Sequence, residues 1–403
     1  MSIGISIGNS YSSVGIANNS QITIIPNSVG NLTTPTCISL SDELLVGDSA
    51  KNSMNSDTIS NIRSLIQTSQ DQTVMNKLSV EELIIILLSD LKKTAESFKQ
   101  TEITEAVLTV PVHFNDFQRT IMKNAAEKTG FTDYKLINEP TAACIAYGIS
   151  GNAVVVDFGA TQLTVSIVNM DEGVAEIIGS NCKQIGGDLI DQLLFEHVAQ
   201  KFFSLHKKDI KNNERATRRL KRMCQRAKHC LSSSQTAQIE LDCICDGIDL
   251  NQSIKLETFN TICDEILKQI VQFVEQTVKE AGIEKDKIQH VVLAGGSCKI
   301  PKVKKLLSEY FNSKQLLCSI NPDEVMAYGA AIQAKKIFHS EEILPKLLEE
   351  DNIVTKLTEE VVKQEVLEQV EEVKSSSGGK CSKLTFIGLI VLISSALLIN
   401  FNQ

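Results

Sequence analysis

The sequence contains one pattern twice: an apolar segment, a short turn with a glycine, and a second segment in which apolar and polar residues alternate. The first copy covers residues 3–17 with Gly8 in its turn, and the second covers residues 154–167 with Gly159 in its turn. Such segments are typical of paired strands in a folded core. We therefore expect a duplicated α/β domain, in which the two hairpins face each other across a cleft.

A third segment of a related kind follows in the second half of the chain. Residues 291–294 form an apolar run that leads into Gly295 and Gly296, and Pro301 then stands where a helix is expected to begin. A glycine pair between a strand and a helix lets the backbone approach a ligand closely. The three segments, in this order, predict a ligand site at the ends of buried strands.

Composition limits the class of partner. The chain has 40 basic and 49 acidic residues and a formal net charge of −9, which argues against nucleic acid, because binding to phosphate backbones needs a basic face. Its 11 cysteines are scattered, so we expect free thiols in a reducing compartment. Residues 1–5 have neither the basic nor the apolar segment of a signal peptide, which makes the cytosol the expected location.

The composition changes after residue 340. Residues 341–374 are acidic with Leu and Val at helical spacing, which predicts an amphipathic helix, either a solvated spacer or docked on the folded body. Residues 375–383 resemble a flexible linker. Residues 384–401 are almost entirely apolar, and we interpret them as a single transmembrane tail anchor rather than a buried core helix.

The residues beside the apolar tail indicate its orientation. Lys380 and Lys383 precede the tail and, by the positive-inside rule, stay on the cytosolic side. The apolar span is short, which suits a thin membrane such as that of the endoplasmic reticulum. We therefore expect a cytoplasmic protein anchored in a cytosol-facing membrane, with the endoplasmic reticulum as the favoured membrane.

Several motifs in the folded part carry a resemblance to a known family. They read NLTTP at 31–35, VPVHFND at 110–116, INEPTAA at 137–143, IGGD at 185–188, AGGS at 294–297, INPDE at 320–324 and AYGAA at 327–331. With these motifs the chain resembles the nucleotide-binding domain of the 70-kDa heat-shock protein family of chaperones. The resemblance implies the two-lobed α/β fold of actin and heat-shock ATPases, built from duplicated ribonuclease-H-like domains. The lobes are expected at about 1–150 and 151–340, with ATP or ADP and Mg²⁺ in the cleft.

The resemblance also identifies positions of the catalytic machinery that have changed. Ser6 and Thr164 stand where the family has aspartates, and Arg63 stands where it has a lysine, whereas Glu139 and Asp157 are retained. Asp157 is the remaining candidate metal ligand. Neutral hydroxyls supply no charge to orient hydrated Mg²⁺, and a planar guanidinium does not replace an ammonium. We therefore expect weakened binding of ATP, ADP and Mg²⁺ and slow or absent hydrolysis, since one lost water-orienting group costs about 10²–10⁴ in rate.

The nucleotide-contacting positions are better retained. On the adenosine side Gln225 replaces a glutamate and His229 an arginine, across the cleft Lys299 replaces an arginine, and in the second turn Ala160 replaces a glycine. The resemblance implies these nucleotide-binding residues: Gly8, Asn9, Ser10, Tyr11, Gly159, Ala160, Thr161, Gly187, Gln225, Lys228, His229, Ser232, Gly295, Gly296, Ser297, Lys299 and Asp323.

Two further departures from the family affect its partners. Residues 67–77 stand where the family has a longer, strand-rich subdomain, which puts the contact with exchange factors in doubt. Nothing after residue 340 resembles the family's substrate-peptide domain or its lid. We expect a membrane-tethered chaperone, co-chaperone or regulator of protein folding, with J-domain proteins as possible partners. Two alternatives stay open: an active ATPase chaperone in which Arg63, Glu139 and Asp157 suffice, and a scaffold that binds no nucleotide.

Overall fold

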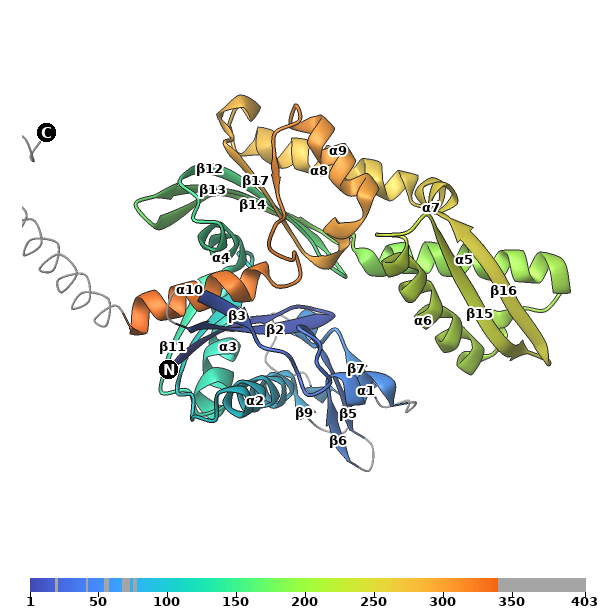
Figure 1. Cartoon of the computed structure of the whole chain (residues 1–403), viewed down its shortest axis with the longest axis horizontal. Coiled ribbons are helices and arrows are strands. Elements are labelled where there is room, and N and C mark those ends of the chain that lie inside the picture. Colours follow the sequence, from blue (N-terminus) through green and yellow to red (C-terminus); the bar gives the residue numbers. More distant parts are fainter. Residues whose placement is uncertain (19–20, 41–42, 54–57, 67–72, 75–77, 340–403) are drawn as a thin grey trace, which may run out of the picture. The chain divides into compact units, whose positions relative to one another are not determined.

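Two β-sheets of the same topology form the centre of the folded chain (Figure 1). The structure is a computed structural model and describes residues 1–339 except 19–20, 41–42, 54–57, 67–72 and 75–77. The strand order is β11-β10-β1-β2-β3 in the first sheet and β14-β13-β12-β17-β18 in the second. From the central strand of each sheet, the neighbours on one side pair in antiparallel fashion and those on the other side pair in parallel. This topology confirms the predicted duplication of an α/β domain.

The strands of the two sheets have the following bounds. The first sheet contains β1 (Ser2–Ile7), β2 (Tyr11–Asn18), β3 (Gln21–Ile24), β10 (Glu105–Val110) and β11 (Asp133–Asn138), and β4 (Thr34–Pro35) pairs with β2. The second sheet contains β12 (Gly151–Phe158), β13 (Leu163–Asp171), β14 (Val174–Lys183), β17 (His290–Ala294) and β18 (Leu316–Leu317). The two repeated segments of the sequence are thus the hairpins β1–β2 and β12–β13.

Amphipathic helices cover each sheet. Helices α2 (Val80–Lys99) and α3 (Asp116–Lys128) share one core with the first sheet. Both begin at capping boxes, because Ser79 pairs with Glu82 and Asn115 with Gln118, which satisfies exposed backbone amides of the first turn.

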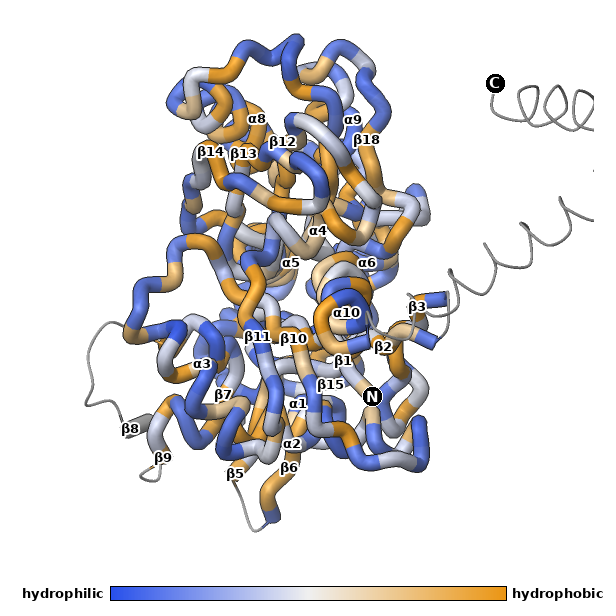
Figure 2. The backbone as a smooth tube through the Cα atoms, turned by 90° about the vertical axis from the view of Figure 1, so that its left-hand side faces the viewer, coloured by the Kyte–Doolittle hydropathy of each residue, from blue (hydrophilic) through white to orange (hydrophobic). Residues whose placement is uncertain are grey.

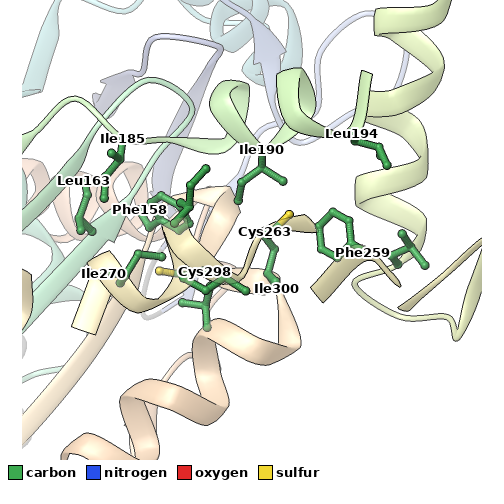
Figure 3. Close-up of a cluster of buried hydrophobic side chains, with 14 of the residues drawn as sticks. Phe158, Leu163, Ile185, Ile190, Leu194, Phe259, Cys263, Ile270, Cys298 and Ile300 are labelled. Atoms are coloured by element: carbon green, nitrogen blue, oxygen red, sulfur yellow. The ribbon is translucent and has the colours of Figure 1, made fainter. Parts of the chain in front are cut away.

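The second sheet is covered by helices α5 (Gly187–His206), α8 (Asp264–Glu280) and α9 (Pro301–Tyr310). Their apolar side chains meet those of the strands, and the close-up shows Phe158, Leu163 and Ile190 from β12, β13 and α5 packed together (Figure 3). Hydrophobic runs, orange in Figure 2, are prominent along the buried strands, as expected of chains that bury both faces of a sheet.

A smaller subdomain projects from each lobe. In the first lobe it contains β5 (Cys37–Leu40), β6 (Leu44–Val46), α1 (Asp48–Asn52), β7 (Thr58–Ser60) and the 3-10 helix η1 (Ile62–Leu65). In the second lobe it contains the 3-10 helix η2 (Ile210–Asn212), α6 (Glu214–Cys230), β15 (Thr236–Cys245), β16 (Ile248–Lys255) and α7 (Leu256–Ile262). The remaining elements are β8 (Thr73–Val74) paired with β9 (Leu78–Ser79), η3 (Lys285–Lys287) and η4 (Gly296–Lys299).

Two helices link the lobes by packing on each other's sheets. Helix α4 (Glu139–Ala146) follows the last strand of the first sheet but packs against β12, β13 and β17, whereas α10 (Val325–Phe338) packs against β1, β2 and β10. The two helices also pack together (Figure 1). A Cβ atom on Gly4 would overlap the backbone of Ala331, and one on Gly329 would overlap the backbone of Ala142. Glycine is therefore required at both crossings.

The C-terminal region predicted from the sequence lies outside the described residues. Residues 1–338 form one compact unit. The predicted amphipathic helix at 341–374, the linker at 375–383 and the membrane anchor at 384–401 all belong to the part that the structure does not describe. Within the described ranges, none of the helices has the length and apolar character that a membrane crossing requires. Of the predicted trimmed segment 67–77, only β8 is described.

Candidate functional site

A cavity of about 990 Å³ lies where the two repeated hairpins meet. The site residues predicted from the sequence are nearly all in its lining. They are Ser6, Gly8, Asn9, Ser10, Tyr11, Arg63, Glu139, Asp157, Gly159, Ala160, Thr161, Gln225, Lys228, His229, Ser232, Gly295, Gly296, Ser297, Lys299 and Asp323. Two predicted residues, Thr164 and Gly187, are not in the lining but contact residues that are. Thr164 pairs with Asp157 on the neighbouring strand, and the amide of Gly187 donates to the carbonyl of Gly159.

The two hairpin turns have the same backbone hydrogen bond and contact each other. The amide of Gly8 donates to the carbonyl of Tyr11 at 3.0 Å, and the amide of Gly159 donates to the carbonyl of Gln162 at 3.0 Å. Asn9 Nδ2 donates to Thr161 Oγ1 at 2.5 Å, which joins the two turns. The hairpins thus face each other as the repeat predicted.

The tips of the turns present free hydrogen-bond donors. Among the described residues, no acceptor is found for the backbone amides of Asn9, Ser10, Ala160 and Thr161. Successive backbone amides in a turn make a favourable site for an anion. The turns can therefore receive phosphate oxygens.

Asp157 lies at the end of β12, where the second hairpin meets the cavity. It pairs in register with Thr164 on β13, whose Oγ1 is buried and has no hydrogen-bond partner in the described structure. Burial, together with the nearby carboxylates of Glu139 and Asp323, raises the pKa of Asp157 to about 7, and the charge of Arg63 opposes this rise. A metal ion on Asp157 would compete with this proton, because a metal-binding carboxylate is deprotonated.

Arg63 and Glu139 form a nearly buried ion pair beside Asp157. The Nη1 of Arg63 donates both to Glu139 Oε1 and to the carbonyl of Ile7, at 3.2 Å in the second case. The two side chains are only 10% and 6% exposed. The charge of Glu139 is therefore already compensated inside the protein.

On the adenosine side, Lys228 forms an ion pair and a hydrogen bond within its own lobe. Its Nζ contacts Asp191 Oδ2 at 2.7 Å and donates to the carbonyl of Gly187 at 2.9 Å. Burial raises the pKa of Asp191 although Lys228 lowers it, so the ion pair does not fully compensate for desolvation. The role of Lys228 in this structure is to join α6 to α5, and its charge is not free for a ligand.

The neighbouring positions on α6 remain open to a ligand. Burial in the cleft lowers the pKa of His229, and the charge of Lys228 adds to this effect, which favours the neutral imidazole. Ser232 Oγ donates to the carbonyl of Lys228 at 3.3 Å. A neutral imidazole can stack on a purine without the charge of the arginine that it replaces.

Across the cleft, glycines bring the β17–η4 turn close to the acidic residues. Gly295 has φ of 76°, and a Cβ there would lie 2.5 Å from Asp157 Oδ1, so both the backbone and the space require glycine. Ser297 Oγ donates to the carbonyl of Gly159 at 2.9 Å. Lys299 Nζ lies 2.5 Å from Asp323 Oδ2, so these two charges also compensate each other.

The sequence did not predict the role of Lys51 and Arg222 in the lining. Lys51 Nζ donates to the hydroxyl of Tyr11 at 2.6 Å, and Arg222 Nη2 on α6 donates to the carbonyl of Lys51 on α1 at 3.4 Å. The second contact spans the cleft between the two projecting subdomains. The only sequence signal was the cationic run on α6, which by itself indicates a solvated face.

The donor set of the cavity fits a nucleotide better than it fits Mg²⁺. The turn amides and basic side chains match phosphates, whereas Glu139 and Asp323 are already in ion pairs. Mg²⁺ needs hard oxygen ligands in octahedral geometry. In the part of the chain that the structure describes, no three His, Cys, Asp or Glu side chains are placed to hold a metal ion together. The described residues thus offer phosphate oxygens more unpaired partners than they offer Mg²⁺.

Comparison with known proteins places this fold and cavity in a family. The family model described as "Hsp70 protein" matches residues 2–81 and 64–354. The chain is 38% identical over 376 residues to heat shock cognate 70 kDa protein 3 of Dictyostelium discoideum, covering 83% of this chain and 60% of that protein. It is 37% identical over 371 residues to a heat shock 70 kDa protein of Neurospora crassa, covering 82% and 57%.

A third relative is similar to the same extent. Heat shock 70 kDa protein 2 of Paracoccidioides lutzii is 38% identical over 371 residues, with 82% of this chain and 57% of that protein covered. The match spans less than two thirds of the length of these curated relatives. The mixed α/β fold is that of the family's actin-like ATPase domain. The chain belongs to the Hsp70 protein family.

Proposed function

We propose that this protein is an Hsp70-type nucleotide-binding protein that holds ATP or ADP and hydrolyses ATP slowly or not at all. The proposal rests on the side chains that surround Asp157 at the cavity. Hydroxyls at Ser6 and Thr164 replace two acidic side chains, and the retained Glu139 is paired with Arg63. The donors for phosphate are present, while the groups that would orient a metal and an attacking water are depleted.

Different groups of residues would contact different parts of the nucleotide. The turn amides, Lys51 and Arg63 would hold the phosphates, and Gln225, His229 and Ser232 would frame the purine with Gly296 and Ser297 opposite. Mg²⁺, where bound, would neutralise charge on the phosphates. Arg63 is fixed by Glu139 and by the carbonyl of Ile7, so it is restricted in following an attacking water.

Calorimetric titration of the full-length protein with ADP and ATP tests the nucleotide proposal. We expect both to bind, and we expect Lys51→Met to weaken the affinity at least about tenfold, since a hydrogen bond to a charged group contributes about 1.5–3 kcal/mol. Lys123→Met, an exposed position on α3 outside the cavity, is the matched control and should bind as the wild type does. Absence of heat at millimolar nucleotide would favour a nucleotide-free scaffold instead.

An active ATP-dependent chaperone is the second candidate. It is favoured by the position of Asp157 and Glu139, which both remain in the cavity beside Arg63. Under this alternative the retained carboxylates and the guanidinium would be enough for turnover. The two candidates differ in rate and not in affinity, so they are separated by a turnover measurement.

We further propose that the protein assists or regulates protein folding at a cytosol-facing membrane, with J-domain proteins as partners. The apolar residues 384–401 and the lysines before them support the membrane location. Proximity labelling in cells, with the full chain and with a chain ending at Ser382, reports compartment and partners together. We expect membrane neighbours only with the tail; unchanged labelling after truncation would refute the anchor.

A further inference from the structure

Two of the carboxylates that line the cavity are already paired with basic side chains of the protein. Glu139 pairs with Arg63, and Asp323 pairs with Lys299 at 2.5 Å. A hydrated cation at either carboxylate would either lie beside the positive charge of its basic partner or displace that partner. Breaking a buried or partly buried ion pair leaves an uncompensated charge and is therefore costly.

The positions beside Asp157 offer no further charge. Thr164 on the paired strand is 6% exposed and Ser6 is 8% exposed. Thr164 Oγ1 is buried without a hydrogen-bond partner among the described residues. A hydroxyl can accept a bond from a metal-bound water but contributes no negative charge, whereas Mg²⁺ in proteins is usually held through one or two carboxylates as well as substrate phosphates.

The phosphates of a nucleotide have other partners in the same cavity. Four backbone amides at the tips of the turns lack acceptors within the described ranges. Arg63 uses only its Nη1 for Glu139 and Ile7, and its Nε and Nη2 have no hydrogen-bond partner in the described structure. Within the described ranges, Lys51 Nζ donates one hydrogen bond, to the hydroxyl of Tyr11, and lies over the ring of the same residue. A guanidinium and an ammonium each donate several hydrogen bonds to phosphate oxygens.

We propose that this cleft binds nucleotide without Mg²⁺, because the turn amides, Lys51 and Arg63 meet the charge of the phosphates directly. This inference rests on the proposed function, since it assumes that the cleft holds a nucleotide. It explains why both lost aspartates are replaced by small hydroxyl side chains: without a metal to hold, a carboxylate at either place would repel the phosphates. Hydrolysis is then lost together with the ion, while binding is kept.

Titration of the full-length protein with ADP, once with excess Mg²⁺ and once with excess EDTA, tests the inference. The expected result is a Kd that differs by less than about threefold between the two conditions, which is about 0.65 kcal/mol. Binding in Mg²⁺ that weakens by more than this in EDTA overturns the inference and leaves the proposed nucleotide binding intact. Absence of binding in both conditions overturns the proposed nucleotide binding and the inference with it.

A pair of matched variants tests the cause. Ser6→Asp/Thr164→Asp restores the two charges, and we expect its ADP affinity to fall about tenfold or more, about 1.4 kcal/mol, when EDTA replaces Mg²⁺. Ser6→Asn/Thr164→Asn has similar side-chain volume without charge and should be insensitive to Mg²⁺, as the wild type is. Circular dichroism confirms that both variants are folded. If the folded Asp variant is equally insensitive to Mg²⁺, the hydroxyls are not the cause and the inference fails.

Discussion

At the scale of single residues, several basic side chains in and beside the cleft are paired with acidic side chains of the same protein. Arg63 with Glu139, Lys228 with Asp191, and Lys299 with Asp323 form ion pairs within the protein. The first two pairs are largely buried, and such pairs contribute little net stability although removing one partner is costly. All three pairs restrict what these side chains can do for a ligand.

The buried pair of Arg63 and Glu139 gives a stability prediction. Arg63→Ala leaves the carboxylate of Glu139 buried without its partner, and we expect a loss of about 3–5 kcal/mol in the free energy of unfolding. The measurement is a urea denaturation of the wild type and the variant. Arg63→Ala/Glu139→Gln removes both charges and should recover part of the loss; an equal loss in both variants would show that the ion pair is not the reason.

Asp157 gives a prediction for the pH dependence of stability. Its pKa rises from the ordinary 3.8 to about 7 in the folded protein, chiefly because of burial and with contributions from Glu139 and Asp323, while the charge of Arg63 opposes the rise. The folded state thus holds this proton more tightly than the unfolded state does. The stabilisation is fully present below the unfolded pKa and is lost as the pH rises through the folded pKa.

The variant Asp157→Asn has no such proton and tests this sign. We expect the difference in thermal midpoint, variant minus wild type, to be more positive at about pH 8 than at about pH 5. The change should be ~2–4 °C for each kcal/mol of stability that the wild type loses over this pH range. Differential scanning fluorimetry at the two pH values gives the comparison, with the exposed Asp171→Asn as the control. A difference that is the same at both pH values would mean that Asp157 does not titrate in this range.

The sequence predicted most of the cavity lining but not the pairing of its charges. Motif positions along the chain identify which turns meet, and the structure places nearly all the predicted residues in one cavity. The contact of Lys228 with Asp191 depends on how α6 packs on α5, and the contact of Arg222 with Lys51 joins residues 171 positions apart. Motif spacing contains no information on such contacts, which are set by tertiary packing.

At the scale of elements, the sequence predicts the two hairpins better than it predicts where helices α4 and α10 pack. The hairpins follow from the repeated strand pattern and the glycine of each turn, so their presence was predictable. The exchange of α4 and α10 between the sheets was not, because an apolar helix pattern does not specify which sheet the helix covers. Glycine at positions 4 and 329 becomes understandable only when the crossing is known.

Gly329→Ala tests the crossing of α10 and α4. The added Cβ would overlap the backbone of Ala142, and we expect a loss of at least about 1–3 kcal/mol in unfolding free energy, the usual cost of overpacking. Gln333→Ala on the same helix controls for helix propensity, because alanine is a strong helix former. Urea denaturation of both variants is the measurement. Stability of Gly329→Ala equal to that of the control would contradict the close approach of the two helices.

At the scale of the whole molecule, the two lobes enclose one cavity through three kinds of link. Helices α4 and α10 each pack on the sheet of the other lobe. The side chains of Asn9 and Thr161 join the two turns, and Arg222 donates to the carbonyl of Lys51 across the projecting subdomains. A nucleotide that contacts both turns would add a fourth link and would stabilise this arrangement by its binding energy.

The most direct test of the account is the rate of hydrolysis of radiolabelled ATP by the full-length protein in Mg²⁺. The wild type is compared with Ser6→Asp/Arg63→Lys/Thr164→Asp, in which the two aspartates and the lysine of the family pattern are restored. We predict that the variant hydrolyses ATP at least about 10²-fold faster, the size of effect expected from restored water-orienting groups. Equal rates would contradict the account: if both proteins hydrolyse ATP, the wild type is an active ATPase, and if neither does, the three replaced residues are not the reason.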